Sequence, residues 1–196
     1  MGVILTATAG LCLWIILWSL NISGLDAILI TTSGCGTVIK DYGFMLREDR
    51  NFAAPAARVS ALAKDITEYI SAIDLEPPRR HGDIVVAYHA ACSLQHGQKI
   101  TQIPKELLSK NGFVVKDVPE SHLCCGSAGT YNILQPDIAN RLRDRKVANI
   151  AMVKPDMIAA GNIGCMVQIA GGTSVPVVHT IELLDWATGG PRPGLN

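Results

Sequence analysis

The sequence predicts an α/β protein made of two open, mostly parallel sheet modules with helices on both faces, the first partial and the second complete. Three observations support this fold class. Apolar runs alternate with helical segments, a strand–turn–cysteine unit occurs twice, and 48% of the 196 residues are hydrophobic while 5% are aromatic. A chain of this length and composition can bury a substantial core.

The repeated unit is DAILITTSGCG (26–36), which matches DMIAAGNIGCM (156–166) without a gap. Each copy has an acidic residue, an apolar run typical of a buried strand, and small residues that form a tight turn before Gly-Cys. Internal similarity between segments so far apart in the chain indicates two copies of one module. The first copy lacks its front half, whereas the second is complete.

Strands and helices alternate through the second copy. The predicted strands are DIVVAY (83–88), FVVKDV (113–118), DMIAA (156–160) and VPVVHT (175–180). The predicted helices are PKELLSKNG (104–112), DIANRLRDRKVANIA (137–151) and IELLDWA (181–187). This alternation predicts a mostly parallel sheet with helices on both of its faces.

A single amphipathic helix is predicted between the copies, over residues 55–73, because its apolar residues fall on one stripe. The residues that follow contain Pro77-Pro78 and several charges, which is typical of a linker. The predicted organisation is an apolar segment (1–24), a partial first module (25–75), a linker (76–82), a complete second module (83–188) and a tail (189–196).

The first twenty residues, MGVILTATAGLCLWIILWSL, carry no charge and are long enough to span a bilayer. Residues 3–20 are interpreted either as a membrane-inserted segment or as a buried helix, with Cys12 as a small buried residue. No Lys or Arg precedes the run, so the basic start of a signal peptide is missing.

Acidic and basic residues balance at 17 each, which argues against nucleic acid as a partner.

Six cysteines in a chain of this size are too few for a disulfide-stapled secreted domain, and they favour metal ligands in a reducing cytoplasm. Cys92, the Cys124-Cys125 pair and Cys165 each come just after a predicted strand. Because the carboxyl ends of parallel strands share one edge of a sheet, these four thiols are expected to converge. Cys35 follows its own strand in the same way.

Converging thiolates are ligands for an iron–sulfur cluster or for zinc. Adjacent cysteines such as Cys124-Cys125 rarely chelate one zinc ion, so the spacing favours a cluster and leaves zinc as the alternative. The small residues 126–129 let the backbone approach closely and offer N–H groups to sulfur. His89, His96 and His122 lie within four residues of a candidate cysteine, as further ligands or as hydrogen-bond donors to sulfur.

The elements YHAACSLQH, HLCCGSAGTYNI and NIGC resemble the cysteine-rich CCG module of heterodisulfide reductase subunits and related electron carriers. The likeness is greatest to the iron–sulfur subunits of glycolate oxidase, and it covers nearly all of residues 25–188. The resemblance implies a metal-binding subunit with an iron–sulfur cluster, expected to be 4Fe-4S. The expected ligands are Cys92, Cys124, Cys125, Cys165 and Cys35, surrounded by His89, His122, Gly126 and Gln168.

The resemblance further implies electron transport. Flavoprotein subunits of a glycolate oxidase complex would oxidise glycolate to glyoxylate, and this chain would relay the electrons towards a quinone pool. The chain would be an oxidoreductase component without a complete active site, because it contains no flavin or nicotinamide fingerprint. The expected location is the cytoplasm, with association to the inner membrane.

Three departures from the family pattern limit these implications. Gln168 stands where many relatives have the last cysteine of Cys-x-x-Cys, which argues against a five-thiolate noncubane cluster. Ser93 stands where a histidine is common, and the upstream Cys-x-x-Cys-x-x-Cys repeats are absent. The chain is therefore interpreted as a C-terminal piece of a longer subunit or as one with a replaced start. A heterodisulfide reductase-like thiol/disulfide subunit and a zinc-stabilised interaction module are the alternative functions.

Overall fold

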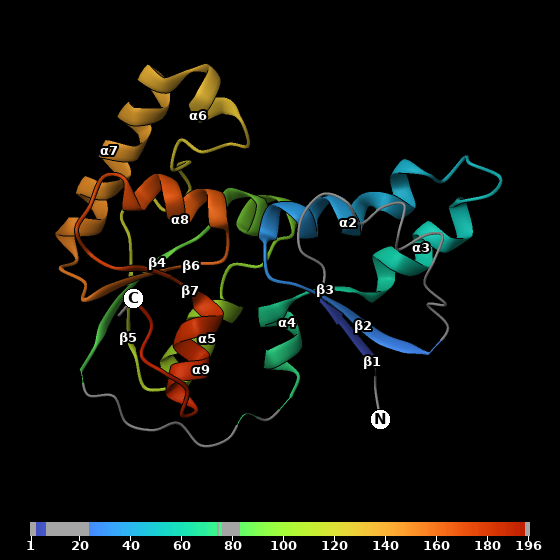
Figure 1. The fold of residues 1–196 in the computed structure, drawn as a ribbon, viewed down its shortest axis with the longest axis horizontal. Coiled ribbons are helices and arrows are strands. Elements are labelled where there is room, and N and C mark those ends of the chain that lie inside the picture. The colour runs from blue at the N-terminus through green and yellow to red at the C-terminus, as the bar shows by residue number, and fades with distance from the viewer. Residues whose placement is uncertain (1–2, 7–23, 74, 76–82, 195–196) are drawn as a thin grey trace. The chain divides into compact units, whose positions relative to one another are not determined.

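The computed structural model describes residues 3–6, 24–73, 75 and 83–194, and the chain falls into two compact units, 1–72 and 73–196. Each unit is built on its own parallel sheet, with strand order β1-β2-β3 in the first and β5-β4-β6-β7 in the second (Figure 1). The predicted α/β fold class with parallel sheets is confirmed. The predicted linker (76–82) lies outside the described residues.

The first unit contains three strands and three helices among the described residues. These are β1 (Val3–Thr6), β2 (Leu25–Ile30), α2 (Ser33–Met45), α3 (Ala53–Leu62), β3 (Ala63–Asp65) and α4 (Ile66–Ser71). Ile28 and Ile30 of β2 pack against α2 and α3, and the strand is buried from Ala27 to Ile30. The buried core is Ile28, Ile30, Ile39, Tyr42, Ala56, Val59 and Ala63.

The start of the apolar N-terminal run forms a strand rather than the beginning of a helix. The backbone of Val3–Thr6 pairs in parallel with β2, with Ile4 opposite Ala27. The rest of the segment considered for membrane insertion, residues 7–20 with Cys12, lies outside the described residues. In the part of the chain that the structure describes, no helix combines the length and apolar character needed to cross a bilayer.

The single helix predicted over residues 55–73 is wrong. The chain leaves α3 after Leu62, and Ala63–Asp65 forms the short strand β3, which pairs in parallel with Ile28–Ile30. The apolar residues of α3 and α4 have the spacing of one continuous helix, although a strand separates the two helices. Hydrophobic periodicity alone therefore could not predict the three-residue strand. Pairing with β2, a contact between segments distant in sequence, decides the conformation here.

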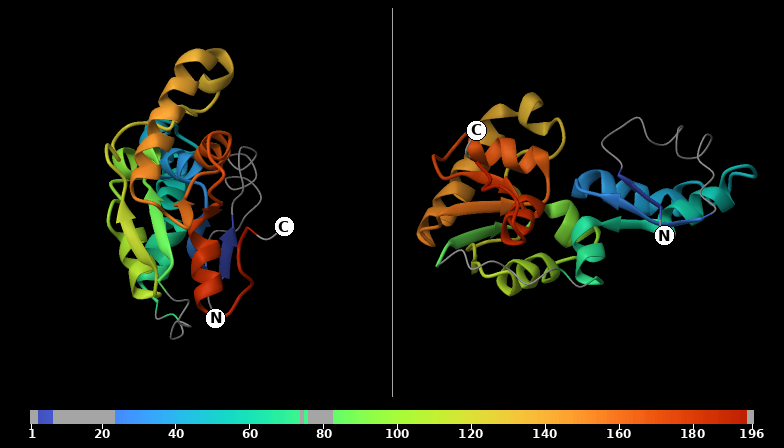
Figure 2. Two further views of the ribbon diagram at one scale, coloured as in Figure 1. Left: turned by 90° about the vertical axis from the view of Figure 1, so that its left-hand side faces the viewer. Right: turned by 60° about the horizontal axis from the view of Figure 1, so that its bottom comes forward.

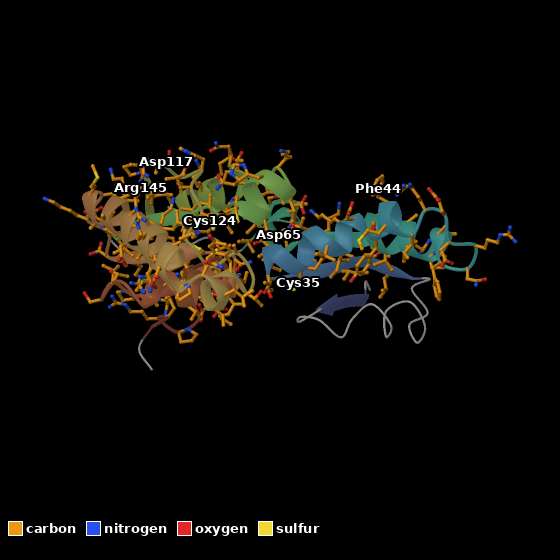
Figure 3. The ribbon with its side chains drawn as sticks, turned by 90° about the horizontal axis from the view of Figure 1, so that it is seen from above. Cys35, Phe44, Asp65, Asp117, Cys124 and Arg145 are labelled. Carbon is orange, nitrogen blue, oxygen red and sulfur yellow. The ribbon has the colours of Figure 1, made fainter. Side chains whose placement is uncertain are left out.

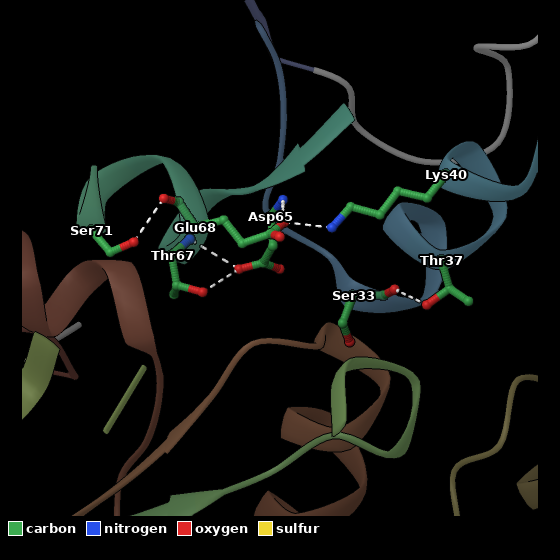
Figure 4. Close-up of polar contacts among 7 residues, drawn as sticks. All are labelled: Ser33, Thr37, Lys40, Asp65, Thr67, Glu68 and Ser71. Carbon is green, nitrogen blue, oxygen red and sulfur yellow. Dashed lines mark hydrogen bonds and ion pairs between the residues drawn. The ribbon is translucent and has the colours of Figure 1, made fainter. Parts of the chain in front are cut away.

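Asp65 ends β3 and begins α4 as its N-cap (Figure 4). The Asp65 carboxylate accepts the Thr67 N–H at 2.9 Å, and the Glu68 carboxylate accepts the Asp65 N–H at 2.8 Å. This reciprocal pair is a capping box, which satisfies two backbone donors that the helix itself leaves without partners. The buried Asp65 side chain therefore fixes the junction between the sheet and α4.

Replacing Asp65 with alanine is expected to lower the free energy of unfolding by about 1 kcal/mol, because the cap of α4 is lost. Urea denaturation followed by circular dichroism would measure the change. Asp41→Ala, at an exposed position of α2, is the control and should change the free energy by less than about 0.5 kcal/mol. Equal effects of the two substitutions would contradict the capping role.

The second unit contains the larger sheet. Its elements are β4 (Val85–His89), the π-helix η1 (Ser93–Gly97), α5 (Ile103–Lys110), β5 (Val114–Asp117), α6 (Tyr131–Leu134), α7 (Pro136–Met152), β6 (Met157–Ala160), α8 (Ile163–Ala170), β7 (Val177–His179) and α9 (Thr180–Ala187). Helices α7 and α8 cover one face of the sheet, and α5 and α9 cover the other (Figures 1 and 2). The face under α7 and α8 carries a core cluster that includes Cys125 and Cys165.

The two units share the same strand register as well as the same sequence motif. In the first unit Ile30 lies opposite Asp65, and in the second unit Ala160, the counterpart of Ile30 in the repeated motif, lies opposite His179. Asp65 and His179 each begin the next helix as its N-cap. A strand corresponding to β5 is absent from the described residues of the first unit. The cysteine pair that follows β5 therefore has no counterpart there.

Candidate metal centre

The carboxyl edge of the second sheet contains a topological switch point. The first strand of this unit, β4, lies between β5 and β6, because the chain adds β5 on one side and then crosses to the other side for β6 and β7. The connection after β4 leads to one side of this strand and the connection after β5 crosses to its other side, so the order of the strands reverses between β4 and β6. Open α/β sheets bind their ligands at such positions.

Four cysteines lie at this edge, each just beyond a strand. Cys92 follows β4 and precedes the π-helix, and the Cys124-Cys125 pair lies in the loop after β5. Cys165 follows β6, in the first turn of α8, where its N–H donates to the side chain of Asn162 at 3.2 Å. Parallel strands therefore bring together residues that are far apart in the sequence.

The sulfur atoms form a connected group. The Cys124 thiol is hydrogen-bonded to those of Cys125 and Cys92, and the Cys125 thiol is also hydrogen-bonded to that of Cys165. Cys165 contacts the ring of His89, and the ligand atoms of His89, Cys125 and Cys165 all lie within 4.8 Å of one another. These last three residues are buried, whereas Cys92 and Cys124 are half-buried. Figure 3 labels Cys124 among the side chains of this unit.

The hydrogen bonds among the four thiols shift their pKa values in different directions. Hydrogen bonds from Cys125 and Cys92 lower the pKa of Cys124 to about 2, and those from Cys125 and His89 lower the pKa of Cys165 to about 5. The hydrogen bond to Cys124 raises the pKa of Cys92, and those to Cys124 and Cys165 raise the pKa of Cys125. These shifts favour the thiolate form at Cys124 and Cys165 and the thiol form at Cys92 and Cys125, and a bound cation would favour ionisation of all four.

A glycine fixes the backbone around the cysteine pair. Gly126 has a φ of +94°, and its N–H donates to Cys124 Sγ at 3.3 Å. A Cβ atom at this position would lie 2.3 Å from the carbonyl oxygen of Ala139 in α7, so no larger residue fits. The loop consequently approaches α7 closely and turns a backbone donor towards sulfur.

His89 provides a test of whether the site suits a metal. Its side chain is 2% exposed at the end of β4, and its Nε2 atom has no hydrogen-bond partner among the described residues. A buried polar atom without a partner is costly unless something absent from the protein itself satisfies it. The His89 ring and the adjacent sulfurs of Cys125 and Cys165 make a donor set that fits a thiophilic metal or cluster.

Comparison with known proteins agrees with this donor set. Residues 86–170 match the family model of the CCG cysteine-rich domain. This part of the second unit is therefore similar to CCG domains. The match begins in β4 and ends in α8, so it spans all four cysteines of the site.

Curated relatives extend the similarity beyond residues 86–170. The chain is 44% identical to the glycolate oxidase iron-sulfur subunit of Escherichia coli (strain K12) over 170 residues, which are 87% of this chain and 42% of the relative. It is 29% identical to the probable glycolate oxidase iron-sulfur subunit of Bacillus subtilis (strain 168), covering 84% of this chain and 39% of the relative. The resemblance found in the sequence is confirmed, and the chain spans about two fifths of these relatives.

The chain covers a larger share of a third relative than of the first two. The chain is 27% identical to lactate utilization protein A of Anoxybacillus flavithermus over 165 residues, which are 80% of this chain and 69% of the relative. The similarity therefore includes proteins whose names refer to lactate as well as to glycolate.

The other residues singled out in the sequence occupy different surroundings. Gln168 is buried in α8, three residues after Cys165, and its amide donates to the Ala139 carbonyl at 3.3 Å and accepts from Asn132 at 3.2 Å. It thereby ties α8 to α6 and α7. His122 is exposed, and its carbonyl contacts the ring of His96 at 3.3 Å. Their influence on a bound metal stays a prediction.

Cys35 belongs to the first unit, in the first turn of α2, and is partly exposed. Among the described residues, groups that could jointly hold a metal occur around His89, Cys125 and Cys165, and Cys35 is not one of them. Ligation by Cys35 stays a prediction. Sequence reasoning missed Lys146, whose side chain donates to the carbonyl oxygen of Glu120, four residues before the cysteine pair.

Proposed function

We propose that this chain is part of an iron–sulfur electron-transfer subunit of a glycolate oxidase-type complex. One observation carries the proposal: four thiols from three separate loops meet at the switch point of one sheet. Four cysteine thiolates are the usual ligand set of a 4Fe-4S cluster. Cys92, Cys124, Cys125 and Cys165 would hold the cluster, which we propose to be of this type.

The residues around the site suit a one-electron carrier. When bound, an iron–sulfur cluster supplies reversible one-electron chemistry. The protein contributes burial on the side of Cys125 and Cys165, and the Gly126 N–H donates to the sulfur of Cys124. Burial slows access of water and oxygen, and a donor to sulfur stabilises the added negative charge of the reduced state.

Partners of the subunit follow from its resemblance to glycolate oxidase iron–sulfur subunits. Flavoprotein subunits of the complex would oxidise glycolate to glyoxylate and pass electrons to this chain, which we place in the cytoplasm in association with the inner membrane. The names of the relatives support an iron–sulfur subunit, and the absence of a nucleotide-binding fingerprint from the sequence supports a partner that carries the flavin.

A zinc site is the second candidate, and one observation favours it. His89, Cys125 and Cys165 form a compact nitrogen–sulfur set, which a further thiol would complete as a tetrahedral site. Such a site would stabilise the unit without transferring electrons. It would also use His89 as a ligand, whereas a cluster held by four cysteines would not.

Metal and sulfide analysis separates the two candidates. Protein purified and reconstituted without air is expected to contain about four iron and four sulfide per chain at this site. Its visible absorbance should decrease on reduction with dithionite. Stoichiometric zinc without sulfide, or no bound metal at all, would overturn the proposal.

A further inference from the structure

Lys146 is the buried cation of the second unit. It lies in α7, its side chain is 1% exposed, and among the described residues it is the one buried Lys or Arg. Removing an ammonium from water costs several kcal/mol unless nearby groups compensate. The surroundings of Lys146 should therefore contain negative charge or strong acceptors.

One acceptor is the backbone of the turn that precedes the cysteine pair. Lys146 Nζ donates to the Glu120 carbonyl oxygen at 2.8 Å, and the Leu123 N–H donates to the same oxygen at 3.0 Å. Glu120 has a φ of +52°, which few residues other than glycine adopt. Lys146 thus holds a turn with a strained residue, and this turn leads directly into Cys124.

Two neighbours on α7 hold the side chain of the same residue. The Glu120 carboxylate accepts Arg145 Nε at 2.8 Å and Asn149 Nδ2 at 2.8 Å. These bonds lower the pKa of Glu120 to about 2, with the Arg145 guanidinium as the main cause. Arg145 is exposed, as Figure 3 shows, whereas Lys146 points into the protein. Both the backbone carbonyl and the side chain of Glu120 are therefore hydrogen-bonded to residues of α7.

The cysteines of the site also offset the cost of burying the Lys146 ammonium. Burial lowers the pKa of Lys146, and electrostatic interactions with Cys125, Glu120, Cys124 and Cys165 oppose this change, in that order. Ile150, one helical turn beyond Lys146, packs in the same core cluster as Cys125 and Cys165. This face of α7 consequently lies against the cysteine site.

We propose that Lys146 is a positioning residue that holds the turn before Cys124 and places a fixed positive charge beside the four sulfurs. The inference rests on the proposed function. A one-electron reduction adds negative charge to the group that the cysteines hold, and a buried cation nearby stabilises that charge more than solvent would. Lys146 therefore raises the reduction potential of the site.

Reconstituted Lys146→Met protein tests the inference, because methionine keeps the approximate length of the side chain and removes its charge. An anaerobic redox titration followed by absorbance and electron paramagnetic resonance measures the midpoint potential. The ratio of reduced to oxidised protein at a fixed potential is expected to fall at least tenfold, which is about 59 mV for a one-electron couple. Arg141→Gln, at an exposed position of the same helix, is the matched control and should leave this ratio within about twofold.

The outcomes separate the inference from the proposed function. Wild-type protein without iron would remove both, whereas wild-type protein with a reducible cluster and an unchanged midpoint in Lys146→Met would overturn the inference alone. If Lys146→Met loses its iron while circular dichroism shows it folded, Lys146→Gln is measured instead, and an unchanged midpoint again overturns the inference. If neither variant folds, Lys146 is a structural residue and the inference is also overturned.

Discussion

Replacing Cys125 with serine is expected to lower the iron retained after anaerobic reconstitution by a factor on the order of ten or more. The Cys125 thiol is hydrogen-bonded to those of both Cys124 and Cys165 and is 1% exposed, so it occupies the centre of the sulfur group. A serine hydroxyl does not ionise near neutral pH and is a poor ligand for iron. Iron content after gel filtration, measured without air, would show the loss.

Cys35→Ser provides the comparison for this experiment. Cys35 lies in the first unit and is not in the group around His89. The substitution should therefore leave the iron held by the second unit unchanged. Equal iron loss in Cys35→Ser and Cys125→Ser would contradict the assignment of the site to the second unit.

Replacing Gly126 with alanine is expected to lower the free energy of unfolding by roughly 3 kcal/mol or more. The added Cβ would lie 2.3 Å from the Ala139 carbonyl oxygen, and the backbone has a φ of +94°. The cysteine loop would have to move away from α7, a rigid helix. Urea denaturation of the metal-free protein measures the change, and reconstituted protein would also retain less iron.

Gly129→Ala is a matched control in the same loop. Gly129 also has a positive φ, +67°, but a Cβ there would meet no atom within 4 Å. The expected loss is about 1 kcal/mol, which reflects the backbone conformation alone. If Gly129→Ala destabilises the protein as much as Gly126→Ala does, the contact with Ala139 is not the cause.

Much of the fold could be predicted because each strand of the second unit is a short apolar run that ends in small or polar residues. The predicted strands 83–88, 113–118 and 156–160 correspond to β4, β5 and β6 within two residues at each end. The order of the strands was not predictable in this way. It depends on pairing between runs that have similar composition, and only the structure shows that β4 lies between β5 and β6.

The environment of the cysteines was harder to predict than their positions. Lys146 ends the run RLRDRK (141–146), in which five of six residues are charged, as is typical of a solvated helix face. Its burial depends on Glu120, far earlier in the sequence, whose carbonyl it meets only in the folded unit. One signal was present, since Lys146 precedes the apolar Ile150 by one helical turn and so shares its side of the helix.

The arrangement of the ligand loops has a consequence for how the protein is made in the cell. Cys92, the Cys124-Cys125 pair and Cys165 are widely separated along the chain, so no short peptide of the nascent chain contains a usable binding site. The sulfurs meet only after β4, β5 and β6 have paired. Maturation should therefore proceed by delivery of a cofactor to an already folded apoprotein, in contrast to zinc fingers, which fold around their metal.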